Sequence, residues 1–316
     1  RTPVFEDTEL FVRTSGDTSE IVTKQMYRFT DKGDRDITLK PEGTAGVIRS
    51  YVEHSLGQQG SVTRLWYSTP IFRYERPQKG RYRQAHQVGL ELIGSPSPDA
   101  DAEVIEITVR FYEALGLKDV CVMVNSLGRS ATRASYRAAL LAHAEPYLAT
   151  LTPEQRAQAE RNPLRILDSK DPEAIAAMAT APSILDYLEP ESKAHFEALK
   201  ALLDERGIRY EVRPEIVRGL DYYSDTVFEV QSNALGSQSS LCGGGRYDGV
   251  VHELGGPPTP SVGVAMGVER AMIVMEALGL NPEPEKLCAF LVGAGESAQP
   301  AVRKLAGELR SSGLSC

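Results

Sequence analysis

A short charged segment, residues 71–94, carries the side chains best suited to chemistry. Its basic residues are Arg73, Arg76, Lys79, Arg81 and Arg83, and a single acid, Glu75, lies between them. Pro77 and Gly80 predict a turn between two strands. A solvated hairpin with basic residues along its edge has the same composition. Guanidinium groups held beside a sheet would instead suit a phosphate, because their paired N–H groups match its oxygens.

The second strand of this segment presents an unusual face. Side chains alternate between the two faces of a strand, so Gln87, Gly89 and Glu91 share one face. Gly89 leaves a gap between two polar groups, which is poor core packing but suits a small ligand lying on the sheet. Arg73 is predicted to lie within the first strand rather than at the exposed tip. The pattern therefore predicts a ligand-binding face with arginines beside it.

Glu42 and Arg270 each admit a structural and a functional interpretation. Glu42 lies in TLKPEGTAG, where Pro41 is predicted to open a helix over residues 41–56. An acid in the first helical turn is ordinary helix chemistry, so the residues alone favour neither interpretation. Arg270 lies at the start of the helix predicted from VERAMIVMEAL, where a cation opposes the helix dipole at a cost of about 0.3–1 kcal/mol. Another interaction must favour Arg270 there.

Two further stretches are rich in residues that line binding sites. Residues 243–249, GGGRYDG, hold more glycines than a plain hairpin needs, and glycine lets a backbone approach a ligand. The strand predicted after Arg218 carries Tyr222 and Tyr223. Taken by themselves, these two tyrosines are better explained as core residues.

Composition excludes several classes of protein. The chain has 316 residues, 41% hydrophobic and 25% charged, as in a globular protein of more than one domain. Its net charge of −8 means that any nucleic-acid contact must come from a local patch. The cysteines form no Cys-x-x-Cys pair, and no P-loop is present. No apolar run approaches the ~20 residues that span a bilayer, which predicts a soluble protein, and the sparse thiols suit a reducing cytoplasm.

The elements that must position these residues alternate between β-rich and helical stretches. Periodicity predicts an extended segment at 1–12, two strands within 21–40, strands at 62–75 and 83–94, a helix at 99–115 and a strand at 117–126. Residues 128–207 predict a helical insertion, and β character returns at 209–231. SVGVAM predicts a strand, LCAFLVG a buried strand and QPAVRKLAGELRSSG a helix. The predicted class is α+β, an antiparallel sheet flanked by helices, with the insertion and the start of a C-terminal α/β domain.

Several motifs give the chain a resemblance to a known family. FRYERPQKGRYRQAHQVG (72–89) resembles motif 2 of the class II aminoacyl-tRNA synthetases in its histidyl form, and GVAMGVER (263–270) resembles motif 3. RGLDYY (218–223) and GGRYDG (244–249) resemble two histidyl signatures, although Val250 follows where the family has Leu. The shorter matches are PEGT (41–44) and TPVFE (2–6), the latter resembling the end of motif 1, which builds the family's dimer interface.

The resemblance implies roles in ATP binding and catalysis. Arg73 would bind the α-phosphate and the substrate carboxylate, and Arg81 would meet the outer phosphates with Glu75 also in contact with ATP. Arg270 would lie over the adenine and contact the γ-phosphate. Arg218 would reach the α-phosphate, where a fixed cation lowers the barrier to attack by a carboxylate. Arg218 and Arg73 are thus the expected catalytic residues.

The resemblance also implies a pocket for histidine. Glu91 and Tyr223 would face the imidazole, whose ring N–H requires an acceptor. Glu42 would hold the substrate ammonium with Thr44 beside it. The whole expected pocket consists of Glu42, Thr44, Gln87, Glu91, Tyr222, Tyr223 and Tyr247.

The implied activity is that of a histidine–tRNA ligase. Histidine and MgATP would form histidyl-adenylate and pyrophosphate, and the histidyl group would move to the 3′ end of tRNA(His). The implied partners are L-histidine, ATP and tRNA(His), with Mg²⁺ as cofactor, in a cytoplasmic homodimer without membrane contact. No residues are assigned to a metal site. The expected domains are catalytic parts at 1–127 and 208–281, an insertion at 128–207 that touches the acceptor stem, and a truncated anticodon-binding domain at 286–316.

Three alternatives remain open from the sequence. A non-catalytic regulatory subunit of ATP phosphoribosyltransferase would share the fold, but such paralogues commonly lose the signatures and lack the anticodon domain. A synthetase for another amino acid would lack RGLDYY. A pseudo-enzyme domain of a larger signalling protein would have little reason to keep both histidyl signatures.

Overall fold

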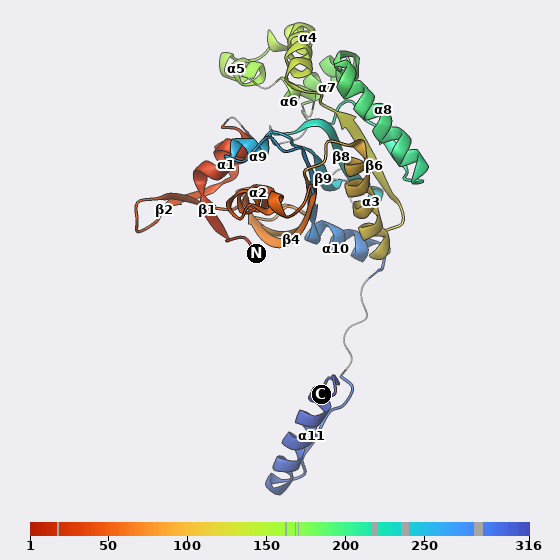
Figure 1. Ribbon diagram of the computed structural model, residues 1–316. Helices are drawn as coiled ribbons and strands as arrows, with labels where there is room; N and C mark the ends of the chain where they lie inside the picture. Colours follow the sequence, from red (N-terminus) through yellow and green to blue (C-terminus); the bar gives the residue numbers. More distant parts are fainter. Residues whose placement is uncertain are drawn as a thin grey trace. The chain divides into compact units, whose positions relative to one another are not determined.

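The computed structural model describes the chain except residues 18, 162, 168, 170, 217–219, 221, 235–239 and 281–286 and the side chain of residue 165. The described residues form two compact units, Arg1–Leu278 and Gly279–Cys316. The larger unit contains two β-sheets and the helices α1 to α10 (Figure 1).

The main sheet of the larger unit has seven strands in the order β4-β5-β10-β9-β8-β6-β7. All neighbouring strands are antiparallel except β6 and β7, which are parallel. Helices flank this sheet, so the predicted α+β class is confirmed. The strands are β4 (Thr63–Phe72), β5 (Gln84–Ile93), β6 (Val120–Ser126), β7 (Tyr210–Val212), β8 (Ser224–Ser232), β9 (Ser240–Arg246) and β10 (Ser261–Gly267).

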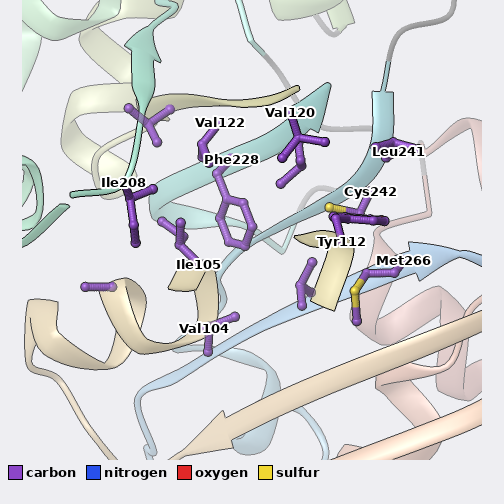
Figure 2. Close-up of a cluster of buried hydrophobic side chains, with 14 of the residues drawn as sticks. Val104, Ile105, Tyr112, Val120, Val122, Ile208, Phe228, Leu241, Cys242 and Met266 are labelled. Carbon is purple, nitrogen blue, oxygen red and sulfur yellow. The ribbon is translucent and has the colours of Figure 1, made fainter. Parts of the chain in front are cut away.

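One face of the main sheet is buried under three helices. Val104 and Ile105 on the inner face of α3 share a buried cluster with Phe228 of β8 (Figure 2). The α3 helix starts after Ser97, whose hydroxyl accepts the backbone N–H of Asp99 at 3.3 Å and so satisfies a free donor of the first turn. Since this face is apolar core, a binding site must use the opposite face. The covering helices are α3 (Pro98–Ala114), α8 (Pro190–Glu205) and α10 (Val268–Ala277).

The opposite face of the sheet combines core packing with polar side chains. Val227 and Phe228 are adjacent on β8 and both fully buried, yet they belong to different clusters because side chains alternate across a strand. Ile48 and Val251 pack in the Val227 cluster from the helices α2 (Thr44–Glu53) and α9 (Val250–Glu253).

The N-terminal region departs from the sequence prediction. Residues 1–12 are not extended throughout, because helix α1 (Thr8–Ser15) begins where Asp7 accepts the backbone N–H of Glu9 at 3.0 Å. The strands before and after α1 in the sequence form a separate three-stranded sheet in the order β1-β3-β2. The elements here are β1 (Phe5–Asp7), a π-helical turn (Ile21–Gln25), β2 (Tyr27–Thr30), β3 (Asp36–Leu39) and, after α2, a 3₁₀ turn (Leu56–Gln59).

The stretch predicted to be helical, residues 128–207, contains only helices among its described regular elements. Ala144 and Ile166 belong to a small buried cluster shared by α4, α6 and α7, whereas Phe196 of α8 packs on the main sheet beside α3. In Figure 1 the helices α4 to α7 are grouped together, apart from β1 and β2. These elements are α4 (Ser130–Leu148), α5 (Pro153–Arg161), α6 (Leu164–Leu167), α7 (Pro172–Met178), a 3₁₀ turn (Ile184–Tyr187) and α8.

The smaller unit contains a 3₁₀ turn (Glu296–Ala298) and helix α11 (Gln299–Ser311). The strand predicted from LCAFLVG is wrong, since the described residues 287–293 form no strand. Leu287, Phe290 and Val292 are 64%, 83% and 76% exposed. A strand needs a second strand for its backbone hydrogen bonds, and the described residues 287–316 offer none.

Among the described residues, no helix is both long and apolar enough to cross a lipid bilayer.

Candidate active site

A row of residues crosses four strands of the main sheet on the face opposite α3. Glu91 of β5 pairs with Gly263 of β10, which pairs with Gly245 of β9, which pairs with Val227 of β8. Paired residues of antiparallel strands point to the same face. A Cβ atom at Gly263 would lie 1.7 Å from Oε2 of Glu91, so the glycine leaves the space that this carboxylate occupies.

The gap expected over Gly89 is filled by Tyr67. Tyr67 pairs with Gly89 across β4 and β5, and a Cβ atom at Gly89 would lie only 2.0 Å from Cζ of the ring. Gly43, just before α2, has the same relation to this ring, with a Cβ distance of 2.3 Å. The prediction of a bare surface at Gly89 is therefore wrong, because the glycine accommodates a cross-strand side chain. Tyr67 is not among the predicted site residues, because only the β4–β5 register pairs it with Gly89.

Glu91 lies at the centre of a buried hydroxyl cluster. Its carboxylate accepts a hydrogen bond from Thr44 Oγ1 at 2.7 Å and another from the hydroxyl of Tyr247. Tyr67 completes the cluster, with its hydroxyl 3.5 Å from Thr44 Oγ1. Burial raises the pKa of Glu91 to about 8, although the donated hydrogen bonds act in the opposite direction. The site thus contains an acid that is mostly protonated at neutral pH when no ligand is present.

Glu42 caps the helix that carries Thr44. Its two carboxylate oxygens accept the backbone N–H groups of Thr44 at 2.6 Å and Ala45 at 2.9 Å. The prediction that Pro41 opens this helix is wrong, because α2 starts at Thr44 after the N-cap residue Gly43, and the Glu42 carboxylate accepts the first two backbone N–H groups. Burial raises the pKa of Glu42, and the two backbone hydrogen bonds and Arg73 oppose that rise. Glu42 therefore has a structural role, and its buried carboxylate lies two residues from Thr44 in the Glu91 cluster.

Three tyrosines form the wall of this cluster. The ring of Tyr222 lies 4.6 Å from the ring of Tyr223 and 5.6 Å from that of Tyr247, measured between centroids. Gly245 makes room for Tyr223, since a Cβ atom there would lie 2.8 Å from the ring. The hydroxyl of Tyr247 donates to Glu91. Gly245 thus accommodates a side chain of the site, whereas Gly244 lies against Phe228 of the core.

Gln87 lies on the same face of β5 as Glu91, two positions from Gly89. Its Oε1 atom is buried and has no hydrogen-bond partner among the described residues. A buried amide oxygen without a partner is costly, so it favours a ligand that supplies a donor. An ammonium or amide N–H group has the required chemistry.

A group of arginines lies around the turn between β4 and β5. Arg73 donates from Nε to the carbonyl of Pro41 at 2.8 Å, and Arg81 lies 3.7 Å from the carboxylate of Glu75. Arg270 donates from Nε to the carbonyl of Gly80 at 3.1 Å. Burial, and next the charge of Arg81, lower the pKa of Arg270. Cations that repel one another across a part-buried space provide a site for a polyanion.

The contacts of Arg270 and Glu269 explain why a cation is found at the start of α10. Arg270 also donates from Nη1 to the carbonyl of Ser240 at 2.6 Å, so it joins β9 to the charged turn. Glu269 accepts the backbone N–H of His86 at 3.0 Å and lies 2.8 Å from its Nδ1. Together these side chains tie the start of α10 to Gly80 within the turn and to His86 near the start of β5.

Arg246 has a structural role that the sequence did not reveal. It is almost fully buried and forms an ion pair with Asp101 of α3, supported by Asp248 at 3.3 Å. Its other N–H groups donate to the carbonyls of Ser95 at 2.9 Å and Ser97 at 3.1 Å. The guanidinium therefore ties the strand before Tyr247 to the loop before α3.

Arg218, predicted to be catalytic, lies outside the described residues, as do Gly219 and Asp221 of the same motif. The other predicted site residues fall into two groups. The first surrounds Glu91 and consists of Glu42, Thr44, Gln87, Tyr222, Tyr223 and Tyr247. The second surrounds the β4–β5 turn and consists of Arg73, Glu75, Arg81 and Arg270.

Comparisons with known proteins identify the family of the chain. A sequence model of the family described as Histidyl-tRNA synthetase matches residues 1–271. A histidine–tRNA ligase of Synechocystis sp. is 51% identical over 314 residues, covering 99% of this chain and 70% of its own length.

Solved structures show the same fold. The apo histidyl-tRNA synthetase of S. aureus matches with a TM-score of 0.79 and 40% identity, covering all of this chain and 74% of that one. A protein of Bacillus halodurans C described as an ATP phosphoribosyltransferase regulatory subunit/histidyl-tRNA synthetase matches with a TM-score of 0.70 but 22% identity. The second likeness shows the fold alone.

Proposed function

Because this chain belongs to the histidyl-tRNA synthetase family, we propose that its two residue groups bind histidine and ATP side by side. The protein is an aminoacyl-tRNA ligase that activates L-histidine with ATP and transfers it to tRNA(His). The observation that carries the assignment of the pocket is Glu91, a buried acid among hydroxyl groups beside an arginine cluster.

The imidazole of histidine is proposed to meet Glu91. In the ligand-free protein Glu91 accepts from Thr44 and Tyr247, and its raised pKa makes a neutral carboxylic acid the main form near pH 7. An imidazole ring has an N–H donor and a basic nitrogen, so it can donate to an oxygen of Glu91 and accept a hydrogen bond from the neutral acid. Few other side chains present both groups to a buried acid.

The amino and carboxylate groups of histidine are proposed to lie toward Gln87 and Arg73. The unpartnered Oε1 of Gln87 suits the ammonium group, and the carboxylate of Glu42 lies near Thr44 on the same side. Arg73, fixed by its hydrogen bond to Pro41, is proposed to hold the carboxylate close to the α-phosphate.

The arginines at the β4–β5 turn are proposed to bind ATP. Arg81 and Arg270 would face the outer phosphates, and Glu75 holds Arg81 in place. A carboxylate oxygen of histidine attacks the α-phosphorus while the bond to pyrophosphate breaks, and Arg73 and Arg218 would stabilise the charge that accumulates on phosphorus. Mg²⁺ would accompany ATP and screen its phosphates; among the described residues, no three His, Cys, Asp or Glu side chains gather as a metal site.

The test is histidine-dependent exchange of labelled pyrophosphate into ATP. We expect exchange with L-histidine and none with the other amino acids, because only an imidazole matches Glu91. The reaction requires no tRNA, so it measures activation alone. Well-folded protein that shows no exchange would instead indicate a non-catalytic regulatory paralogue, and exchange with a different amino acid would refute the pocket assignment.

We also propose a cytoplasmic homodimer, with the helices of residues 128–207 contacting the tRNA acceptor stem and residues 286–316 belonging to an anticodon-binding domain. Phe5 and Phe29 of the N-terminal sheet are about half exposed, which suits contact with a second copy. Sedimentation at micromolar concentration tests the dimer, and a monomer there would refute it.

A further inference from the structure

The start of helix α4 contacts the strand segment that leads into the tyrosine wall. Arg133 donates from Nη1 to the backbone carbonyl of Tyr223 at 3.2 Å. Arg129, directly before the helix, lies with its Nε 3.3 Å from Oδ2 of Asp225. Residues four apart lie on one side of a helix, so both guanidinium groups reach the same segment.

Asp225 has an unusual backbone in this segment. Its φ of 47° lies in the left-handed region, which non-glycine residues seldom adopt. Two backbone hydrogen bonds hold it there, one from Leu127 N–H to its carbonyl at 2.8 Å and one from its own N–H to Gly128 at 3.0 Å. The β8–β9 register shifts between Ser224 and Val227, so the chain bends where it enters the sheet.

The side chain of Asp225 depends on Arg129. Its carboxylate is 3% exposed, whereas Arg129 is 55% exposed. Oδ1 of Asp225 is buried without a hydrogen-bond partner among the described residues. A buried carboxylate needs a compensating charge, and Arg129 supplies one from the helical stretch.

The same turn of α4 is also joined to α8. The backbone N–H of Glu189, directly before α8, donates to Thr132 Oγ1 at 3.2 Å. Arg129 lies 3.5 Å from the carboxylate of Glu191 in the first turn of α8. The start of α4 is therefore held on one side by α8 and on the other by the chain around Tyr223.

We propose that Arg129 and Arg133 are positioning residues for histidine binding. Arg133 reaches the first residue group through the backbone carbonyl of Tyr223, and Arg129 pairs with Asp225, which belongs to neither group. They hold the backbone of the Tyr223–Asp225 segment and thereby set the place of the Tyr223 ring beside Tyr222 and Tyr247. The proposal rests on the proposed function, and it makes the affinity for histidine depend on side chains contributed by the helical stretch 128–207.

The first experiment compares Arg133→Ala, Arg133→Lys and Arg137→Ala by pyrophosphate exchange. Arg137 is the matched control, because it lies one turn further along α4, is exposed, and donates to the carbonyl of Glu160 instead. We expect Arg133→Ala to raise the KM for histidine about five- to tenfold and the KM for ATP less than about twofold. Arg133→Lys should restore part of the loss, since Lys can still donate to the carbonyl of Tyr223. Arg137→Ala should behave as the wild type.

A second variant tests the proposal with a smaller risk of misfolding. Asn tolerates the left-handed region, so Asp225→Asn keeps the backbone geometry while removing the charge that pairs with Arg129. We expect a KM for histidine raised about threefold or more, with an unchanged KM for ATP. Equal increases in both KM values, an unchanged KM for histidine in Arg133→Ala, or the same effect in Arg137→Ala would overturn the proposal.

Amide hydrogen exchange separates this proposal from the proposed function. Without any substrate, Arg133→Ala should speed exchange at the amides of Tyr222–Thr226 at least about tenfold and leave β5 unchanged, because the lost contact is local. Unchanged exchange at these amides would overturn the proposal even in an active enzyme. A wild-type protein without histidine-dependent activity would refute the proposed function, whatever the amides of the variants show.

Discussion

The chemistry at the level of single residues centres on the protonation of Glu91. Its pKa is about 8 in the folded protein and near the ordinary value of 4.5 when the chain is unfolded. A raised folded pKa contributes stability that is fully present below pH 4.5 and is lost as the pH rises through 8. The ligand-free protein therefore keeps an acid whose ionised form is favoured only when a cation arrives.

This shift predicts a pH-dependent stability that Gln would remove. Glu91→Gln keeps the shape and the acceptor oxygen but does not titrate. We expect the melting temperature of the wild type to fall relative to Glu91→Gln between pH 5 and pH 8, because the wild type must increasingly bury a charge. Thermal melts without ligand at several pH values measure this difference. Parallel melting curves for both proteins across that range would contradict the raised pKa.

At the scale of elements, pairs of glycine and aromatic residues shape the pocket. Gly89 and Gly43 enclose the ring of Tyr67, and Gly245 lies against the ring of Tyr223. At Gly89 the sheet thus lacks a Cβ atom on β5, and the ring of Tyr67 from β4 fills the space. The pocket is consequently sensitive to atoms added at these glycines.

The cross-strand pair predicts strong coupling between two substitutions. Gly89→Ala places a methyl group 2.0 Å from Cζ of Tyr67, so we expect a loss of about 1–3 kcal/mol in the free energy of unfolding and a large loss of activity. Gly89→Ala in a Tyr67→Ala background should cost much less, because the ring is gone. Urea unfolding of the four proteins measures the coupling energy.

Gly33→Ala is the matched control for that cycle. A Cβ atom at Gly33 has its nearest neighbour, Oδ1 of Asp31, at 3.4 Å, an ordinary contact distance. We expect a change within about 0.5 kcal/mol. Additive effects of Gly89→Ala and Tyr67→Ala would show that the two positions do not interact.

Sequence patterns predicted which residues of the site form strands better than they predicted which residues lie opposite them on neighbouring strands. Period-two alternation placed Gln87 and Glu91 on one face of a strand, and β5 has that face. Tyr67 was missed because the occupant of the space over Gly89 is decided by the register of a neighbouring strand. The start of α2 was placed at Pro41 because local helix rules cannot show that the Glu42 side chain folds back onto Thr44 and Ala45.

At the scale of the whole molecule, the described buried clusters of the larger unit are built from residues before Leu278. The smaller unit exposes Leu287, Phe290 and Val292 and has no strand among its described residues. Here the sequence predicted a helix correctly and a strand incorrectly. A hydrophobic run in the sequence predicts burial, but a strand also needs a neighbouring strand for its backbone hydrogen bonds, which the run itself does not provide.

This division predicts that residues 279–316 are dispensable for histidine activation. A chain ending at Leu278 should melt within about 3 °C of the full chain and keep pyrophosphate exchange within about twofold. A chain ending at Gly267 is the control and should unfold, because it lacks α10, whose Val274 is fully buried. Loss of exchange from the chain ending at Leu278 would refute the independence of the larger unit.

The contact between His86 and Glu269 has a consequence for how the protein is made. The two residues are 183 positions apart, and Tyr247 is 156 positions from Glu91. A ribosome adding about 5–20 residues per second needs roughly 10–40 s to pass from β5 to the start of α10. Throughout that interval the nascent β5 edge has no β10 to pair with and is open to wrong partners. Overproduction in cells should therefore benefit from added chaperones, most of all for variants that weaken β4 and β5.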